Sequence, residues 1–449
     1  MRALNRLLCV LSVLVMMLGC LAGCNQNPSD GGEQGTQAPA QNVDYAAEVK
    51  LDMQSETAKV KVNGIHAFID GDTTHFEVPT SVAPTGILKA RYLAINTPES
   101  TGKIEEYGKT AAAFTKEKLS GASSIYIESD DANWNLDSTG GRHLVWVWYR
   151  NSENEEYRNL NIEILQNGLA IASNSAQNRY GEKAVAAINQ AKAQKLHVYS
   201  GQKDPNFFYG EAVELTLKEL RSNIEAYNGM KVAFNGIITA NEGQAVYIED
   251  YDAETNMYYG MYIYYGFALS GEGLEILSVG NEARIVGTVQ YYEVGGTYQV
   301  SGLSYRQMKP NDPGNIQKLS DGHSPAYFLT DPATFVNGKV EIEREDEVVS
   351  LDYASLVQST SLEMRNLVVK RVYTTTSETS SDQGAMTLTC EVDGVQISVR
   401  TAVLYDQEGK LVTEEYFAGK TIDVKGLVDY FNGSYQIKVL SLANINVHE

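Results

Sequence analysis

Four short segments carry the residue types that could bind a cation or an anionic group. Asp70-Gly71-Asp72-Thr73 is an acidic turn between two alternating apolar stretches, and Arg91 lies in the next such stretch. Asn96-Thr97-Pro98-Glu99 follows, and Arg142 comes directly after Gly140-Gly141. Carboxylates suit hard metal ions, and guanidinium groups suit phosphate. Taken singly, each segment also has an ordinary structural explanation, because Asp-Gly favours hairpin turns and strand arginines commonly form surface ion pairs.

The elements that must position these segments have the pattern of an α+β domain, which we place at residues 45–205. Alternating apolar residues predict strands over 58–69, 73–78, 87–95, 124–128 and 143–149. Helices are predicted over 106–119, 159–166 and 182–194. A half rich in strands followed by helices is typical of a barrel-type α+β fold.

Together, in this order and spacing, the segments resemble the staphylococcal nuclease (thermonuclease) family. The matching residues are 69–73, 91–99, 106–108, 113–116, 141–142 and 161–169. The resemblance covers nearly all of residues 58–199, about a third of the chain. It implies an OB-type barrel with helices and a phosphodiester hydrolase, specifically a thermonuclease-like endonuclease, with DNA or RNA as the substrate.

The resemblance implies a Ca²⁺ site. Asp72 would bind the ion through its carboxylate, and Thr97 would bind it through its backbone carbonyl. Where the family usually has a second aspartate ligand, this chain has Asn96. An amide oxygen can still coordinate Ca²⁺, but the site loses one negative charge, so we expect weaker Ca²⁺ binding without a necessary loss of activity.

The resemblance also assigns the catalytic roles. Glu99 would be the general base that activates a water molecule for in-line attack on phosphorus. Arg91 and Arg142 would clamp the phosphate and stabilise the charge that grows on its oxygens. Asp70 would support the metal site without binding the ion.

The rest of the chain forms two related blocks, at residues 211–308 and 326–449, joined by a linker at 309–325. The end of the first block, Val286 to Val300, is similar to Lys425 to Ile437 in the second, which indicates a divergent duplication. A short helix leading into about five strands predicts a small OB-like β-barrel in each block. Another small barrel or a β-sandwich is the alternative.

The block at 211–308 is rich in aromatic residues that could stack single-stranded bases. Alternation should place Tyr262 and Tyr264 on one face and point Ile263 into the barrel. The alternative is that tyrosine is simply a good strand former, and acidic neighbours such as Glu249 and Asp250 weaken the nucleic-acid hypothesis. The ligand of these blocks stays open: a cell-wall polymer, a protein or nothing. The aromatic residues are Tyr247, Tyr258, Tyr259, Tyr262, Tyr264, Tyr265 and Phe267.

The N-terminus predicts export. Arg2 and Arg6 precede an apolar run that is too short for a transmembrane helix, so residues 1–23 have the pattern of a signal peptide. Leu21-Ala22-Gly23-Cys24 resembles the bacterial lipoprotein processing motif, which implies cleavage before Cys24 and a lipid on its sulfur. Residues 24–44 would be a flexible tether on the extracellular face of the bacterial cell membrane. A plain signal peptide or an uncleaved anchor is the alternative.

Charge and cysteine content narrow the chemistry further. The net charge is −21, and loss of the two signal-peptide arginines makes it −23. Such a chain lacks the basic face needed for bulk electrostatic capture of nucleic acid. Cys390 is the only cysteine left after processing and lipidation, so we expect no intramolecular disulfide and a buried strand thiol.

The sequence therefore predicts a lipid-anchored, Ca²⁺-dependent extracellular nuclease with two OB-like accessory barrels. The alternative is a non-catalytic cell-surface lipoprotein that binds nucleic acid or another polymer through its barrels. The sequence leaves open the preference for DNA or RNA and the oligomeric state.

Overall fold

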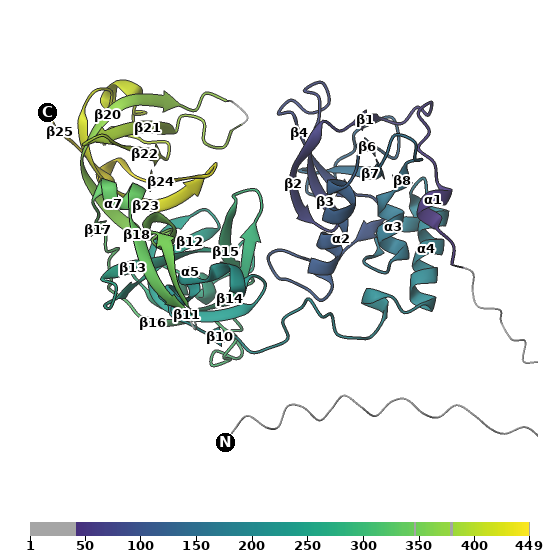
Figure 1. Cartoon of the computed structure of the whole chain (residues 1–449), viewed down its shortest axis with the longest axis horizontal. Coiled ribbons are helices and arrows are strands. Elements are labelled where there is room, and N and C mark those ends of the chain that lie inside the picture. Colours follow the sequence, from purple (N-terminus) through teal and green to yellow (C-terminus); the bar gives the residue numbers. More distant parts are fainter. Residues whose placement is uncertain (1–41, 345–346, 378–379, 449) are drawn as a thin grey trace, which may run out of the picture. The chain divides into compact units, whose positions relative to one another are not determined.

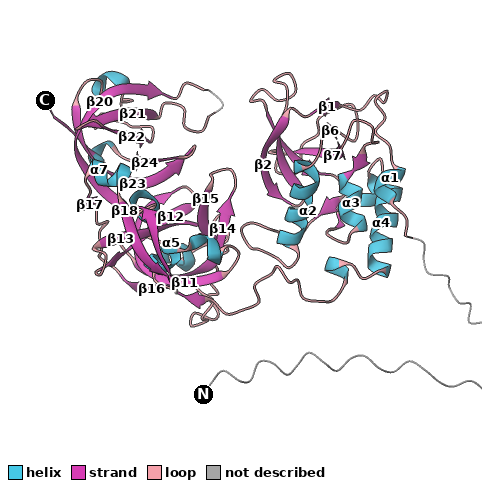
Figure 2. Cartoon of the chain, viewed as in Figure 1, coloured by secondary structure: helices cyan, strands magenta, loops and turns pink. Residues whose placement is uncertain are grey.

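The computed structural model describes residues 42–344, 347–377 and 380–448, so the predicted signal peptide and Cys24 lie outside the described part. From Asp44 onward the chain forms one compact unit. Its strands build a series of closed barrels with few helices (Figures 1 and 2), which confirms the predicted α+β, OB-like fold class. Within the described residues, every helix is too short or too polar to span a bilayer.

The first barrel has the strand order β2-β3-β4-β7-β6-β1, in which β4 and β7 run parallel. Its strands are β1 (Lys59–Lys61), β2 (Gly64–Asp70), β3 (Thr73–Glu77), β4 (Ile87–Tyr92), β6 (Ser124–Glu128) and β7 (His143–Arg150). The segment predicted as one strand over 58–69 is split between β1 and β2. This bend lets β1 pair with β6 while β2 pairs with β3, which closes the barrel.

Helices and short pairings complete this domain close to the predicted positions. The longer helices are α2 (Gly108–Ser120), α3 (Leu160–Gln166) and α4 (Gly181–Ala193). The shorter elements are α1 (Tyr45–Glu48), β5 (Ile95–Asn96), β8 (Arg158–Asn159) and β9 (Ile171–Ala172). The Asn161 side chain ties α3 to β7, because its amide oxygen accepts from Val147 N at 2.9 Å and its Nδ2 donates to Val145 O at 3.0 Å.

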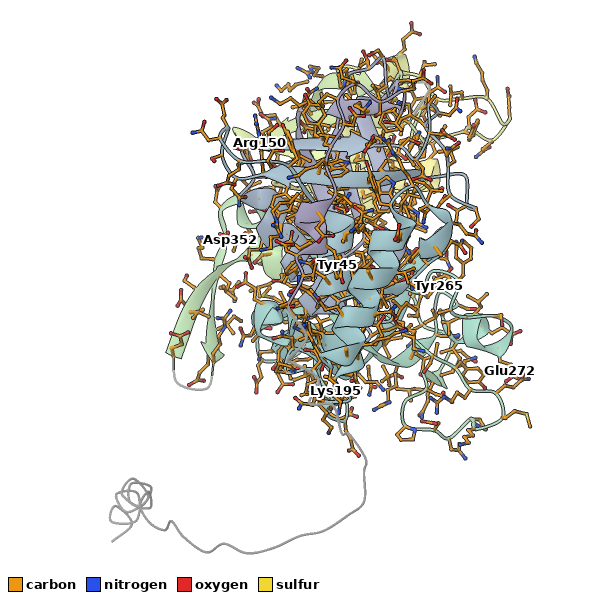
Figure 3. The ribbon with its side chains drawn as sticks, turned by 90° about the vertical axis from the view of Figure 1, so that its right-hand side faces the viewer. Tyr45, Arg150, Lys195, Tyr265, Glu272 and Asp352 are labelled. Carbon is orange, nitrogen blue, oxygen red and sulfur yellow. The ribbon has the colours of Figure 1, made fainter. Side chains whose placement is uncertain are left out.

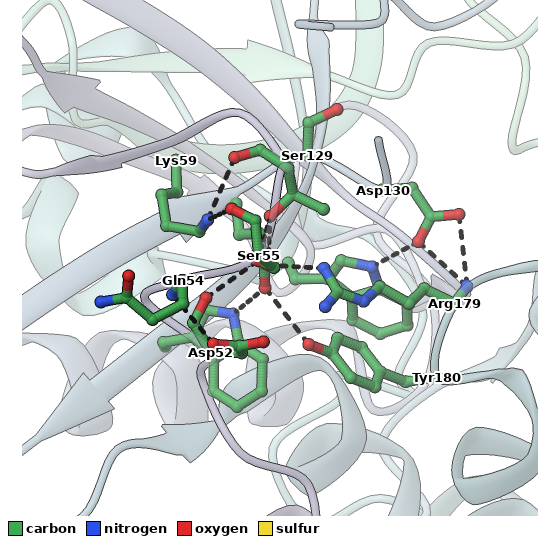
Figure 4. A network of polar contacts seen from close by, with 12 residues as sticks. Asp52, Gln54, Ser55, Lys59, Ser129, Asp130, Arg179 and Tyr180 are labelled. Atoms are coloured by element: carbon green, nitrogen blue, oxygen red, sulfur yellow. Dashed lines mark hydrogen bonds and ion pairs between the residues drawn. The ribbon is translucent and has the colours of Figure 1, made fainter. Parts of the chain in front are cut away.

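A network of polar contacts around the buried Glu128 joins segments of this barrel that are far apart in the sequence. Figure 4 labels Asp130, Arg179 and Tyr180 of this network. Glu128 is 0% exposed. It accepts hydrogen bonds from Thr57 Oγ1 at 2.6 Å, Arg179 Nη1 at 2.9 Å and Trp148 Nε1 at 3.0 Å. Asp130, beside it, accepts from Trp146 Nε1 at 2.8 Å. The network joins the segment before β1 to β7 and to the start of α4.

The next two barrels repeat one topology. β11-β12-β13-β15-β14 closes by pairing β11 with β14, and β20-β21-β22-β24-β23 closes by pairing β20 with β23. In both barrels the third strand in chain order runs parallel to the fifth, that is, β13 to β15 and β22 to β24. The strands are β11 (Lys231–Glu242), β12 (Ala245–Asp252), β13 (Met257–Tyr264), β14 (Glu282–Tyr292), β15 (Thr297–Ser301), β20 (Ser361–Thr374), β21 (Met386–Val392), β22 (Val395–Thr401), β23 (Thr421–Phe431) and β24 (Ser434–Val439).

One glycine in each copy shows why the duplicated sequence keeps its motif. A Cβ at Gly287 would lie 2.6 Å from Val300 Cγ1, and a Cβ at Gly426 would lie 2.6 Å from Ile437 Cγ2. These positions correspond in the sequence repeat. In each barrel the neighbouring strand therefore approaches too closely for any side chain.

Peripheral elements surround the two barrels. Thr216 and Glu219 form a capping box at the start of α5 (Leu217–Ser222). The segment 309–325, predicted as a linker, contains β16 (Gln317–Ser320), which pairs with β14 and so belongs to the second barrel. The hairpin of β18 (Lys339–Arg344) and β19 (Glu347–Asp352) is a separate two-stranded sheet, with Asp352 near its base (Figure 3). The others are β10 (Val213–Glu214), α6 (Glu272–Ile276), β17 (Phe328–Leu329), α7 (Pro332–Asn337), α8 (Tyr353–Leu356) and β25 (Ile445–His448).

Cys390 lies in β21, fully buried and with a free thiol, as predicted. Burial raises the pKa of this thiol to about 12. A thiol with such a pKa carries almost no thiolate at neutral pH, so Cys390 is a core side chain and not a nucleophile.

Candidate nuclease site

The β2–β3 turn and the end of β4 bring together three of the predicted site residues. Asp72 is 1% exposed and forms an ion pair with Arg91. Arg91 Nη2 donates to Asn96 Oδ1 at 2.5 Å. Thr73, next to Asp72, pairs with Arg91 across the strands, so the sheet register itself fixes this contact. Two side-chain oxygens therefore converge on one guanidinium.

Thr97 also contacts the group formed by Asp72, Arg91 and Asn96, through the carboxylate of Asp72. Its backbone N–H donates to Asp72 Oδ2 at 2.8 Å, while its hydroxyl oxygen is buried without a partner among the described residues. Gly71 allows this approach, because a Cβ there would lie 2.9 Å from Ala111 Cβ and from Thr97 Cγ2. Thr115 on α2 also donates to Gly71 O at 2.6 Å. Helix α2 thus holds the acidic turn against the Thr97 segment.

Glu99 lies exposed in the loop after Pro98, beside the buried carboxyl of Asp70. Burial and the nearby Glu99 charge raise the pKa of Asp70 to about 7. The Glu99 backbone is fixed, because its carbonyl accepts from Glu105 N at 2.9 Å and a Cβ at Gly108 would overlap it. The structure thus places an accessible carboxylate next to the Asp72 turn.

Arg142 is held by a residue that the sequence analysis did not single out. Asp137 Oδ2 accepts from Arg142 Nε at 2.7 Å and forms an ion pair with Nη2 at 2.6 Å. Burial alone would raise the pKa of Asp137, but hydrogen bonds from Thr139 and Arg142, with the Arg142 charge, bring it to about 2. The signal in the sequence is an acid five residues before the arginine, across a turn that contains Gly140 and Gly141.

The two arginines act electrostatically on one another. Burial and the Arg142 charge lower the pKa of Arg91, while nearby Asp70 and Glu99 oppose the shift. The two guanidinium groups are close enough to repel one another, although each is ion-paired, Arg91 with Asp72 and Arg142 with Asp137. An anion such as a phosphate would relieve that repulsion.

The oxygen atoms near Arg91 also bear on metal binding. Among the described residues, no group of three or more His, Cys, Asp or Glu side chains could hold a metal ion. The predicted ligands are instead one carboxylate, one amide oxygen and one backbone carbonyl, from Asp72, Asn96 and Thr97. These are hard oxygen donors of the kind Ca²⁺ prefers, and two of them already converge on the Arg91 cation, so the donor chemistry fits Ca²⁺.

The fold and this site define an OB-type barrel that carries two neighbouring, ion-paired arginines beside an accessible carboxylate. Residues 89–200 match the family model described as "Staphylococcal nuclease homologue". Arg91, Asn96, Thr97, Glu99 and Arg142 fall inside the matched range, and the Asp72 turn lies before it. A comparison with curated proteins gave no match. The family match supports a domain of nuclease type or of nucleic-acid-binding type in this region.

The tyrosine-rich strands of the second barrel form a different surface. Ile263 is fully buried in the barrel core, while Tyr262 and Tyr264 face outward, as alternation predicted. Other aromatic residues of the group are committed to packing: Tyr259 is fully buried, and the ring of Tyr258 lies 5.7 Å from that of Phe328. Only part of the predicted aromatic surface is therefore open to a ligand.

Proposed function

We propose that the first barrel is a Ca²⁺-dependent nuclease that hydrolyses phosphodiester bonds of DNA or RNA. The convergence of Asp72, Arg91 and Asn96 within one barrel, next to the exposed Glu99, carries this proposal. The match of residues 89–200 to the nuclease family supports it.

In the proposed reaction, Glu99 removes a proton from a water molecule whose oxygen attacks phosphorus. The bond from phosphorus to the leaving sugar oxygen breaks, and the family resemblance implies that this leaves a 3′-phosphate end. Exposure of Glu99 gives water access to the base. Burial and the Glu99 charge raise the pKa of Asp70, so this neighbouring carboxyl is not fully ionised beside Glu99 at neutral pH.

The arginines would stabilise the charge on the phosphate oxygens. Asp137 engages Nε and Nη2 of Arg142, so Nη1 points away from this carboxylate and is suited to meet a phosphate oxygen. Arg91 is oriented by Asp72 and Asn96. The Arg142 guanidinium is thus preorganised before substrate arrives, which reduces the entropy cost of binding. Arg91 contacts the same oxygens that would hold Ca²⁺, so binding of the ion would release the Arg91 guanidinium toward the phosphate.

Asp72, Asn96 and the Thr97 carbonyl would hold Ca²⁺, which supplies Lewis-acid stabilisation when bound. With one carboxylate among these ligands, we expect weak binding. Extracellular Ca²⁺ sites commonly work at about 10⁻⁴–10⁻³ M, so such a site would still fill outside the cell.

The test is hydrolysis of single-stranded DNA and RNA by residues 45–449 across a Ca²⁺ titration from micromolar to tens of millimolar. Glu99→Ala is the blank, and Asn96→Asp is the comparison. We expect turnover that saturates at high Ca²⁺ and disappears in the blank. Restoring the carboxylate should lower the half-saturating Ca²⁺ concentration by about tenfold, the effect of ~1.4 kcal/mol of added attraction. No turnover in any of the three forms would refute the catalytic proposal.

We also propose that the chain acts on the extracellular face of the bacterial membrane, anchored through a lipid on Cys24. The Leu21-Ala22-Gly23-Cys24 sequence supports this location. Cell fractionation tests it: Cys24→Ala should release the protein from the membrane or block its processing. Unchanged membrane retention and unchanged mass in this variant would refute the lipid anchor.

A further inference from the structure

The loop that begins at Glu99 is attached to the second barrel at its tip. The two ends of the loop are joined, because Glu105 N donates to Glu99 O at 2.9 Å and Glu99 N donates to Glu105 Oε2 at 3.2 Å. At the tip, Gly102 N donates to Gln290 Oε1 at 3.0 Å, and Gln290 Nε2 donates to Gly102 O at 2.9 Å. Ser301 Oγ also donates to Gly102 O, at 3.2 Å. One amide side chain of the second barrel thus pairs with both backbone polar groups of a single loop residue.

The contacts at the loop tip are shielded from water. Gln290 on β14 is 4% exposed, and Ser301 on β15 is fully buried. Gly302 follows Ser301, and a Cβ at this position would lie 3.0 Å from Gly102 O. The absence of a side chain at Gly302 therefore lets the loop come this close. Because water does not readily replace a buried partner, these hydrogen bonds restrain the loop more than exposed contacts do.

A second contact joins helix α2 to the same barrel. Lys116 Nζ forms an ion pair with Glu293 Oε1 at 2.5 Å, and these two side chains are 51% and 34% exposed. Exposed ion pairs of this kind contribute little to stability. The buried hydrogen bonds of Gln290 and Ser301 are therefore the main attachment of the Glu99 loop.

The residues that meet Gly102 differ between the two copies of the repeat. The sequence repeat and the strand register align Gln290, Ser301 and Gly302 of the second barrel with Asp429, Lys438 and Val439 of the third. An ionised carboxylate in place of the Gln290 amide has no donor for the Gly102 carbonyl, and a valine in place of Gly302 would collide with it. The duplicated barrel itself therefore requires neither the amide nor this glycine. Contact with the loop explains why the second barrel has both.

We propose that Gln290 is a positioning residue for the nuclease reaction, through which the second barrel holds the Glu99 loop beside the Asp72 turn. This inference rests on the proposed role of Glu99 as the general base. A general base acts only while it is within hydrogen-bond reach of the water proton that it removes. A loop that is fixed before substrate arrives keeps Glu99 within that reach and removes part of the entropy cost of the reaction. The second barrel is thereby part of the catalytic unit.

The test compares the full-length chain in detergent with Gln290→Met, Ser301→Ala and a control variant, Gln436→Met. Methionine is close to glutamine in length but has no amide to pair with Gly102. Gln436 is the matched control, because it is a glutamine of the third barrel, 8% exposed on β24, whose Nε2 donates to Asp429 at 2.7 Å. Hydrogen–deuterium exchange followed by mass spectrometry measures the protection of residues 100–104. Steady-state hydrolysis of single-stranded DNA at saturating Ca²⁺ gives kcat and KM.

We expect Gln290→Met to speed exchange over residues 100–104 about tenfold, because both hydrogen bonds of the amide are lost. Exchange in β11 and β12 should stay as in the parent, which shows that the barrel is folded. We expect kcat to fall about tenfold while KM changes by less than about twofold, since the arginines keep their contacts. Ser301→Ala should change exchange and kcat in the same directions by about two- to threefold, and the control should change neither.

Unchanged exchange over residues 100–104 in Gln290→Met would overturn the attachment of the loop. Faster exchange with an unchanged or higher kcat, in a chain whose parent is active, would overturn the positioning role alone. If Gln290→Met unfolds β11 and β12, Ser301→Ala decides between the same outcomes. A parent chain without turnover would refute the nuclease proposal and this role with it, so the activity of the parent distinguishes the two failures.

Discussion

Replacing Asp137 with asparagine should slow phosphodiester hydrolysis without abolishing it. The carboxylate contacts Arg142 through Nε and Nη2, at 2.7 and 2.6 Å, and its other oxygen accepts from Thr139 Oγ1 at 2.7 Å. An asparagine side chain has only one acceptor oxygen, so its NH₂ group would face either the N–H groups of Arg142 or the hydroxyl of Thr139. The Arg142 side chain would therefore lose the contact that fixes its direction.

The magnitude follows from the kind of bond that is lost. A hydrogen bond to a charged group contributes about 1.5–3 kcal/mol, against about 0.5–1.5 kcal/mol for a neutral one. Because the Arg142 side chain is 36% exposed, water partly replaces the lost contact. A net loss of about 1–2 kcal/mol in transition-state stabilisation corresponds to a rate reduction of about 5- to 30-fold. Removing the guanidinium itself, as in Arg142→Ala, should cost about 10³-fold or more.

A double-mutant cycle on kcat/KM at saturating Ca²⁺ measures this coupling. In the Arg142→Ala background, Asp137→Asn should change the rate by less than about twofold, because the group it positions is absent. Asp131→Asn is the matched control, since Asp131 is an exposed aspartate near the start of the same loop that accepts from the Asn133 backbone. Equal effects of Asp137→Asn with and without Arg142 would refute the positioning role.

Two further predictions concern the stability of the first barrel. Glu128→Gln should lower the free energy of unfolding of this barrel by about 3 kcal/mol, because Arg179 loses its buried partner. Urea unfolding followed by tryptophan fluorescence measures this change, and a loss below about 1 kcal/mol would contradict the explanation. Burial and the charges of Lys89 and His66 lower the pKa of His75 to about 4 in the folded chain. As the pH falls, the His75 side chain therefore takes up a proton near its ordinary pKa of 6.5 in the unfolded chain, but only near pH 4 in the folded chain. The stability that the neutral His75 side chain contributes is thus complete above pH 6.5 and is lost as the pH falls to 4. His75→Asn should therefore lose less stability over this pH range than the parent protein. Parallel curves of stability against pH for the two proteins would show that His75 has no such role.

Local patterns in the sequence predicted most strands of the first barrel, because alternation follows directly from one buried face. The strand over Ser124–Glu128 has the predicted bounds, and β7 differs from its prediction by one residue. β16 was missed inside a segment rich in turn residues. It is four residues long, with a half-buried or exposed side chain at every position, so it has no apolar alternation to detect.

In the candidate site, too, some contacts could be predicted from the sequence and others could not. The order of the motifs predicted that Asp72, Arg91 and Asn96 belong to one site, and the strand register brings them together. The Asp137–Arg142 contact depends on how a loop folds back, which residue spacing alone does not fix. Glu249 shows the same limit, because the sequence analysis treated it only as an acidic neighbour of the tyrosines. In the structure its carboxylate is buried and accepts hydrogen bonds from three donors of the third barrel.

The acidity of the chain and a phosphate-binding site are compatible because the two act over different distances. At physiological ionic strength, charges separated by more than about 8 Å are largely screened. The net charge of −21 therefore opposes long-range capture of nucleic acid but has little effect on a phosphate already in contact with Arg91 and Arg142. The acidity of the chain is therefore compatible with the phosphate contacts that we propose for Arg91 and Arg142.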